Sequence, residues 1–128
     1  MERKNYLIDT NVAIYYFGVA LSKDSEKFMD QILGGKYFIS VINRIELMGF
    51  KKIEENEIAA LSSFISNSHI FELKEEITLK TIEIRKNYNI KLPDAIIAAT
   101  CLVNNYYLIT NNAKDFDKII GLHIVNVN

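Results

Sequence analysis

Four acidic residues stand where apolar runs of the sequence begin or end, and together they could bind a metal ion. Asp9 follows "YLI", Asp94 interrupts "LPDAIIAAT", and Asp115 lies in "TNNAKDF". Glu46 lies within "VINRIELMGF", after the run "YFIS". Clustered carboxylates repel one another and tend to take up a proton unless a cation compensates. Because no imidazole or thiolate stands near them in the sequence, these oxygen ligands favour Mg²⁺ or Mn²⁺ over Zn²⁺.

An acidic magnesium site is suited to cleaving phosphodiesters. The metal neutralises the scissile phosphate and lowers the pKa of a water molecule toward neutrality. Other catalytic groups give no comparable pattern: His69 and His123 are far apart, at positions typical of strand flanks, and Cys101 lies on a helix that runs away from Asp94. The sequence has no glycine-rich phosphate loop, Ser-His-Asp order or Cys-x-x-Cys pair. Metal-dependent hydrolysis is therefore the leading hypothesis.

Each acid also has an ordinary structural interpretation. Asp9 can cap a helix, Asp94 can favour a helix dipole, Glu46 can be an exposed helical residue, and Asp115 can close a turn. The other acids fall in amphipathic, solvent-facing contexts, and Glu72 precedes a helix start and is interpreted as a surface residue. The hypothesis depends on the four acids meeting at one place.

The segments that carry these acids alternate between strand-like and helix-like runs. Five short strands are expected, at Tyr6–Ile8, Tyr37–Ser40, Ile70–Leu73, Tyr107–Thr110 and His123–Val127. Helices are expected between them, at 12–17, 22–33, 41–49, 55–66, 75–88 and 91–105. This alternation predicts an α/β fold in one domain, with a mainly parallel central sheet flanked by helices. In such sheets the ligand site lies at the carboxyl ends of the strands, which is where the acids are expected.

Composition limits the classes of protein that fit. With 128 residues, of which 49% are hydrophobic and 24% charged, the chain is expected to form one folded domain spanning residues 1–128. The net charge of −1 gives no global attraction to nucleic acid. A single cysteine excludes an internal disulfide, and neither an apolar signal core nor a membrane-spanning run is present. We therefore expect a cytoplasmic protein.

The stretches "YLIDTNVAIYYF", "FISVINRIELMGF" and "LPDAIIAATCLVNNYYLITNNAKDF" resemble the motifs of the PIN-domain ribonuclease family. In size and layout the chain also resembles the VapC-type toxins of toxin–antitoxin pairs, and the resemblance covers nearly the whole chain. It implies a PIN-like fold and an Mg²⁺- or Mn²⁺-dependent endoribonuclease that cleaves RNA. The resemblance implies a set of metal ligands and two supporting polar residues, which map onto Asp9, Glu46, Asp94 and Asp115, and onto Asn11 and Thr110.

The last motif departs from the common family pattern. Many PIN domains carry an acid two residues after the threonine, where this chain has Asn112. The variant form, with an acid before phenylalanine, fits "KDF" and Asp115. The fourth ligand thus has three candidates: Asp115, Asn112 as a neutral ligand, and the more distant Asp117.

The resemblance also implies partners, namely a homodimer and a small VapB-like antitoxin that binds in or near the acidic site. The apolar segment Val12–Leu21 is a candidate interface, although core packing explains much of it equally well. Basic residues near the site segments could form a phosphate-binding track or be ordinary solvated positions. These are Arg44, Lys51, Lys52, Arg85, Lys86, Lys91 and Lys114.

Two alternatives come from other functional classes. A phosphoacceptor receiver domain has a similar length, but it would need adjacent acids after the first strand and a lone aspartate after the third. "LIDTN" and "IFELKEE" supply neither. A PIN-like interaction module without catalysis is the second alternative, and the joint presence of Asp9, Glu46 and Asp94 argues against it.

Overall fold

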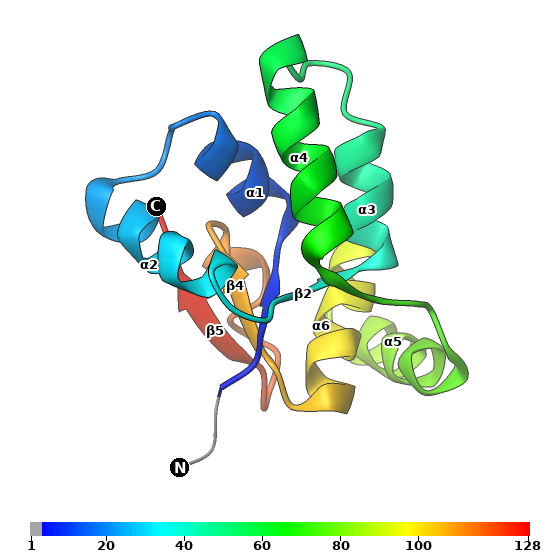
Figure 1. Ribbon diagram of the computed structural model, residues 1–128. Helices are drawn as coiled ribbons and strands as arrows, with labels where there is room; N and C mark the ends of the chain where they lie inside the picture. Colours follow the sequence, from blue (N-terminus) through cyan, green and yellow to red (C-terminus); the bar gives the residue numbers. More distant parts are fainter. Residues whose placement is uncertain (1–3) are drawn as a thin grey trace.

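The computed structural model describes residues 4–128 and contains one sheet of five parallel strands (Figure 1). The strands lie in the order β3-β2-β1-β4-β5, which places the first strand at the centre. Their bounds are β1 Tyr6–Ile8, β2 Phe38–Ser40, β3 His69–Phe71, β4 Tyr107–Thr110 and β5 His123–Asn126. The predicted α/β class with a parallel five-stranded sheet is confirmed.

In the part of the chain that the structure describes, six α-helices connect these strands. They are α1 Thr10–Phe17, α2 Lys23–Leu33, α3 Val41–Met48, α4 Glu55–Asn67, α5 Glu75–Asn87 and α6 Leu92–Asn104, and a short 3₁₀ helix, η1, covers Ala113–Asp115. Local sequence explains several ends. Asp9 and Ser22 cap α1 and α2 with their side chains, Pro93 lies in the first turn of α6, and Asn105 ends α6 in the left-handed conformation.

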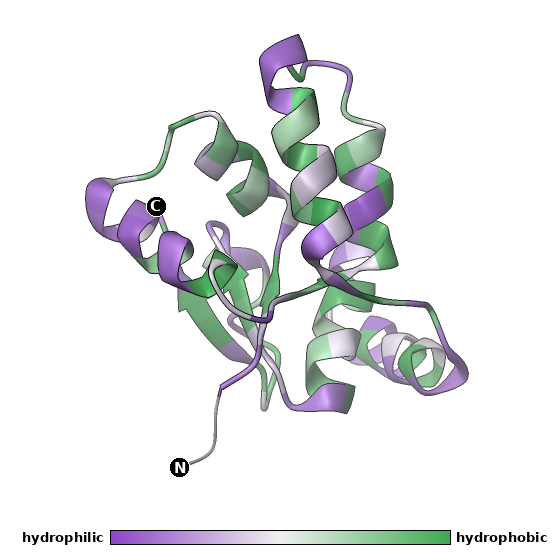
Figure 2. Cartoon of the chain, viewed as in Figure 1, coloured by the Kyte–Doolittle hydropathy of each residue, from purple (hydrophilic) through white to green (hydrophobic). Residues whose placement is uncertain are grey.

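The core forms two layers because neighbouring residues of each strand point to opposite faces of the sheet. Leu7 and Leu108 pack with residues of α5 and α6 on one face. Ile8 and Ile109 pack with residues of α1, α2, α3 and α4 on the other. Figure 2 shows hydrophobic residues along the strands between these helix layers. Both faces of the sheet are therefore covered, which leaves its strand ends as the places for a site.

The predicted bounds of the third strand need correction. The third strand begins at His69 and ends at Phe71, so Leu73 lies beyond it. In α3, the apolar residues Ile45 and Met48 are 62% and 65% exposed. A polar residue of this helix, Asn43, is buried. Within residues 4–128, no helix is long and apolar enough to cross a membrane.

Candidate functional site

The four predicted acids line one cavity. Its volume is about 210 Å³, and its wall also includes Thr10, Asn11, Lys91, Pro93, Asn112 and Phe116 beside Asp9, Glu46, Asp94 and Asp115. Each acid comes from a different element. Asp9 follows β1, Glu46 lies in the second turn of α3, Asp94 in the first turn of α6, and Asp115 ends η1 after β4. The carboxyl ends of neighbouring parallel strands β2, β1 and β4 thus bring distant segments together.

Asp9 is the most buried of the four acids, with 9% of its surface exposed. Its Oδ1 accepts a hydrogen bond from the backbone N–H of Thr10 at 2.9 Å, and its Oδ2 accepts one from the Thr110 hydroxyl at 2.9 Å. Burial raises the pKa of Asp9 from 3.8 to about 6, although both hydrogen bonds act to lower it. The charges of Asp94 and Glu46 raise the pKa of Asp9 further. The two hydrogen bonds therefore fix the orientation of Asp9, while burial and the nearby charges disfavour its ionised form.

Glu46 is exposed, but a chain of buried polar groups reaches its carboxylate. The Thr10 hydroxyl donates to Glu46 Oε1 at 2.7 Å and accepts from Asn43 Nδ2 at 3.0 Å. Asn43 Oδ1 in turn accepts from the backbone N–H of Ser40 at 2.7 Å, which forms a capping box at the start of α3. Asn43 is fully buried, and both ends of its amide are hydrogen-bonded. This series of hydrogen bonds links Glu46 to Thr10, the residue that follows Asp9.

Asp94 and Asp115 line the same cavity as Asp9. Burial raises the pKa of Asp94, with the charges of Asp115 and Glu46 adding to the effect and Lys91 opposing it. Asn112 donates a hydrogen bond to Asp115 Oδ2, so these two candidates for the fourth ligand are in contact. The expected repulsion between carboxylates is therefore present, but for both Asp9 and Asp94 burial is the larger cause of the raised pKa.

The donor set fits a hard divalent cation. Four carboxylates face the cavity, and no His or Cys belongs to its described lining. Among residues 4–128, no three His, Cys, Asp or Glu side chains converge closely enough to enclose a metal ion. Asp9 is buried and held by two hydrogen bonds, whereas Glu46 and Asp115 are exposed and each accepts one side-chain hydrogen bond. Closing a ligand shell would therefore require movement of the exposed carboxylates.

Comparison with known proteins identifies the family. The PIN-domain family model matches residues 6–122. The chain belongs to the PIN-domain family. It is 28% identical to the curated protein "Ribonuclease VapC2" of Rickettsia felis, over 94% of this chain and 96% of that protein. PIN-domain ribonucleases generally need a divalent metal ion, in agreement with the acidic cavity.

Solved structures give the same assignment. A chain of a toxin–antitoxin complex from Klebsiella pneumoniae matches with 32% identity and a TM-score of 0.76, over 95% of this chain and 97% of that one. A chain of VapBC2 from Rickettsia felis bound to a promoter DNA fragment matches with 25% identity and a TM-score of 0.79. That match covers 96% of this chain and 98% of the other.

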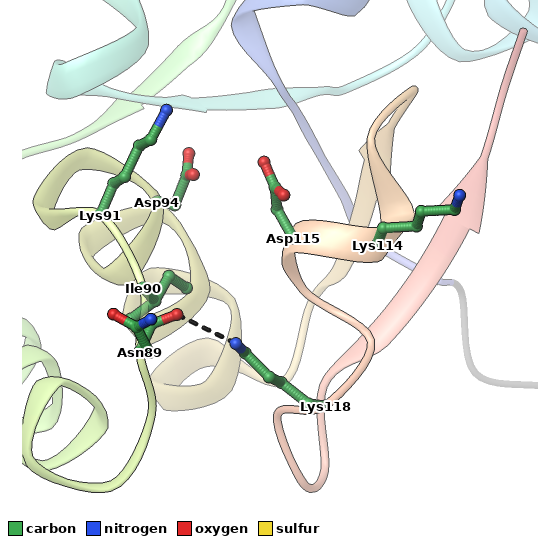
Figure 3. Close-up of a pocket in the computed structure, with 7 residues that line it drawn as sticks. All are labelled: Asn89, Ile90, Lys91, Asp94, Lys114, Asp115 and Lys118. Atoms are coloured by element: carbon green, nitrogen blue, oxygen red, sulfur yellow. Dashed lines mark hydrogen bonds between the residues drawn. The ribbon is translucent and has the colours of Figure 1, made fainter.

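A second cavity adjoins the acidic one in this PIN domain and carries positive charge. Its volume is about 260 Å³, and its lining includes Lys91, Lys114 and Lys118 together with Asp94 and Asp115. Figure 3 shows the two acids directed toward a common opening, while Lys118 reaches across to the backbone carbonyl of Asn89. That hydrogen bond measures 3.0 Å. Lys118 was not predicted from the sequence, because only the tertiary fold brings its loop beside the start of α6.

The remaining predicted positions have varied surroundings. Thr110 is buried and bonded to Asp9, Asn11 lies at the cavity wall, and Asp117 lies outside the lining of the acidic cavity. Burial raises the pKa of the Cys101 thiol, which argues against a nucleophilic role. Of the seven basic residues considered from the sequence, Lys91 and Lys114 line one or both cavities; the other five, Arg44, Lys51, Lys52, Arg85 and Lys86, line neither.

Proposed function

We propose that this chain is a metal-dependent endoribonuclease and the VapC-type toxin of a toxin–antitoxin pair. The observation that carries the proposal is the meeting of four acids from four elements in one cavity at the carboxyl ends of the sheet. Membership of the PIN-domain family supports it, as do the name of the Rickettsia felis relative and the toxin–antitoxin complexes among the matched structures.

Asp9, Glu46, Asp94 and Asp115 are the proposed catalytic residues and would hold Mg²⁺ or Mn²⁺. A bound ion of this kind neutralises phosphate charge and lowers the pKa of water, which is the chemistry that phosphodiester hydrolysis needs. The protein contributes orientation. Thr110 and the Thr10 backbone fix Asp9, the Thr10 hydroxyl directs Glu46, and Asn112 holds Asp115. Asn11 is a further supporting residue at the cavity wall.

RNA would approach over the cavity that contains lysines. Lys91 lines both cavities, and its charge lowers the pKa of Asp94. Because the chain has a net charge of −1, this local group of cations has to supply the attraction for the phosphate backbone. Lysines beside a carboxylate site place adjacent phosphates without reading the sequence.

The proposed partners follow from the same assignment. A VapB-like antitoxin would restrain the enzyme, two copies would form a homodimer, and residues 1–128 would act as one domain in the cytoplasm, where RNA substrates are present. Coexpression with the antitoxin of the same operon should restore growth and yield a copurifying complex. Light scattering on the chain alone would test the dimer separately.

The deciding experiment is cleavage of a mixed RNA panel by the purified protein with Mg²⁺, with Mn²⁺ or with EDTA. We expect cleavage only with metal, and a loss of at least about a hundred-fold in Asp94→Asn, because one ligand charge is removed. Asp117→Asn is the matched control, since Asp117 is an exposed acid outside the acidic cavity. Cleavage of no RNA, together with calorimetry showing no metal binding, would leave the non-catalytic interaction module as the better assignment.

A further inference from the structure

A third cavity lies on another side of the acidic site and differs from it in chemistry. Its volume is about 370 Å³, and its lining residues are Asn11, Tyr15, Ala20, Asn111, Asn112 and Asn128. Asn11 and Asn112 also line the acidic cavity, so the two spaces share a wall. A molecule whose one end faces the carboxylates can therefore extend into this third cavity, called here the asparagine cavity.

No acidic or basic side chain belongs to the described lining of the asparagine cavity. Four of its six residues are asparagines, whose amides each offer donors and an acceptor. In contrast, the cavity of Figure 3 has three lysines and two aspartates. A phosphate is suited to the lysines, whereas neutral amides match the edge of a nucleobase, with which Asn forms paired hydrogen bonds.

The groups that could contact a base are available. The Tyr15 side chain is 46% exposed, and its ring takes part in none of the aromatic pairs within residues 4–128. Asn112 uses its amide nitrogen on Asp115, which leaves its carbonyl oxygen as an acceptor. Within the described residues, no side-chain hydrogen bond occupies the amides of Asn11 or Asn111. An aromatic ring beside unpaired amides is the combination by which proteins hold unstacked RNA bases.

We propose that the asparagine cavity binds one unpaired nucleobase of the RNA, next to the phosphate that faces the acidic site. This inference rests on the proposed ribonuclease function and adds base selection to it. Tyr15 supplies the stacking surface, and Asn111 contacts the edge of the base. The protein then prefers single-stranded or looped RNA, because a paired base cannot enter the cavity.

Binding can be measured without cleavage in an Asp94→Asn background, because Asp94 lies outside this cavity. The probe is a short single-stranded RNA with one 2-aminopurine, whose fluorescence falls on stacking, scanned along the strand with Mg²⁺ present. We expect strong quenching at one position, loss of that quenching in Tyr15→Ala, and its retention in Tyr15→Phe. The affinity for the probe should fall about five-fold or more in Tyr15→Ala, the value of one base stacked on an aromatic ring.

Asn111→Ala tests the hydrogen bonds, and Asn56→Ala is its matched control, since Asn56 is an exposed asparagine of α4 that lines no cavity described above. In the protein that retains Asp94 and can cleave, sequencing of the cleaved RNA ends should show a preference for one base at one position. Asn111→Ala should reduce this bias about five-fold or more, and Asn56→Ala should preserve it. A bias that Asn111→Ala leaves intact would contradict the inference.

The two proposals fail in different ways. If the protein cleaves RNA but the Tyr15→Ala variant quenches the probe as fully as the protein with Tyr15, the proposed base binding is wrong and the nuclease function stands. If quenching depends on Tyr15 but no RNA is cleaved, the base cavity stands and the nuclease is wrong. Circular dichroism of each variant identifies any loss of fold. If Tyr15→Ala is unstable, Tyr15→Phe still tests the role of the aromatic ring, because it keeps the ring.

Discussion

Replacing Asp9 by Asn should make the metal-free protein more stable at neutral pH while abolishing RNA cleavage. Asp9 is buried between β1 and α1, and burial raises its pKa from 3.8 to about 6. An ionised carboxylate in this position destabilises the fold, because its charge is better solvated in the unfolded chain. Asparagine has nearly the same shape and no charge.

The size of the effect follows from the two pKa values. A change from 3.8 to about 6 corresponds to about 3 kcal/mol when Asp9 is ionised in both states. Asparagine keeps an acceptor for the Thr10 N–H but presents an amide to Thr110, whose hydroxyl must turn, at a cost of about 1 kcal/mol. The net expectation is a gain of about 2 kcal/mol, or roughly 6–10 °C in Tm.

The pH dependence gives the sharper test. Since the folded pKa is raised, protonation of Asp9 favours folding: its contribution is full below about pH 3.8 and is lost as the pH rises through about 6. The advantage of Asp9→Asn should therefore be absent near pH 4 and complete near pH 7. Urea unfolding in EDTA between these values measures it, with Asp117→Asn as the control on an exposed acid. A variant less stable than the parent at pH 7 would refute the reasoning.

Three further predictions concern Thr110, Lys118 and Val19. Thr110→Val removes a hydrogen bond that lowers the pKa of Asp9, so the acidic limb of the pH profile of the cleavage rate should move to higher pH. Thr100→Val is the control and should leave the profile unchanged, because the Thr100 hydroxyl donates only to a carbonyl of its own helix. Lys118→Ala should raise the KM for RNA several-fold and reduce the salt slope of binding by about one, as measured by anisotropy titrations. Val19→Gly should raise the Tm measured by calorimetry by a few degrees. Val19 is 79% exposed and has φ 54, a backbone angle at which a β-branched residue costs about 1 kcal/mol. An unchanged Tm would mean that the loop relieves the strain.

The sequence predicted the strands well because short apolar runs followed by helix-capping residues have few other structural interpretations. Asp9 illustrates this, since the residue that ends β1 also caps α1. Once parallel pairing is inferred, the strand ends share one edge, and acids at those ends are expected to meet. The cavity common to the four acids follows from this topology.

The sequence could not predict the contacts that orient the acids. The link from Asn43 through Thr10 to Glu46 joins residues separated by more than thirty positions, and no periodic pattern marks it. Lys118 was missed for the same reason, because its contact with Asn89 depends on how two loops pack. A strand-and-helix pattern fixes which residues approach each other, whereas side-chain rotamers decide which of them bond.

The acidic site and the stability of the fold are linked through Asp9. Its position is fixed by the sheet, because the residue after the central strand must both cap α1 and face the strand ends. Burial there makes ionised Asp9 costly, and the nearby charges of Asp94 and Glu46 increase that cost. A proton or a cation can each relieve it, so the two compete for the same oxygens. At neutral pH the proton is largely lost, and binding of the proposed cation to these oxygens would then stabilise the fold.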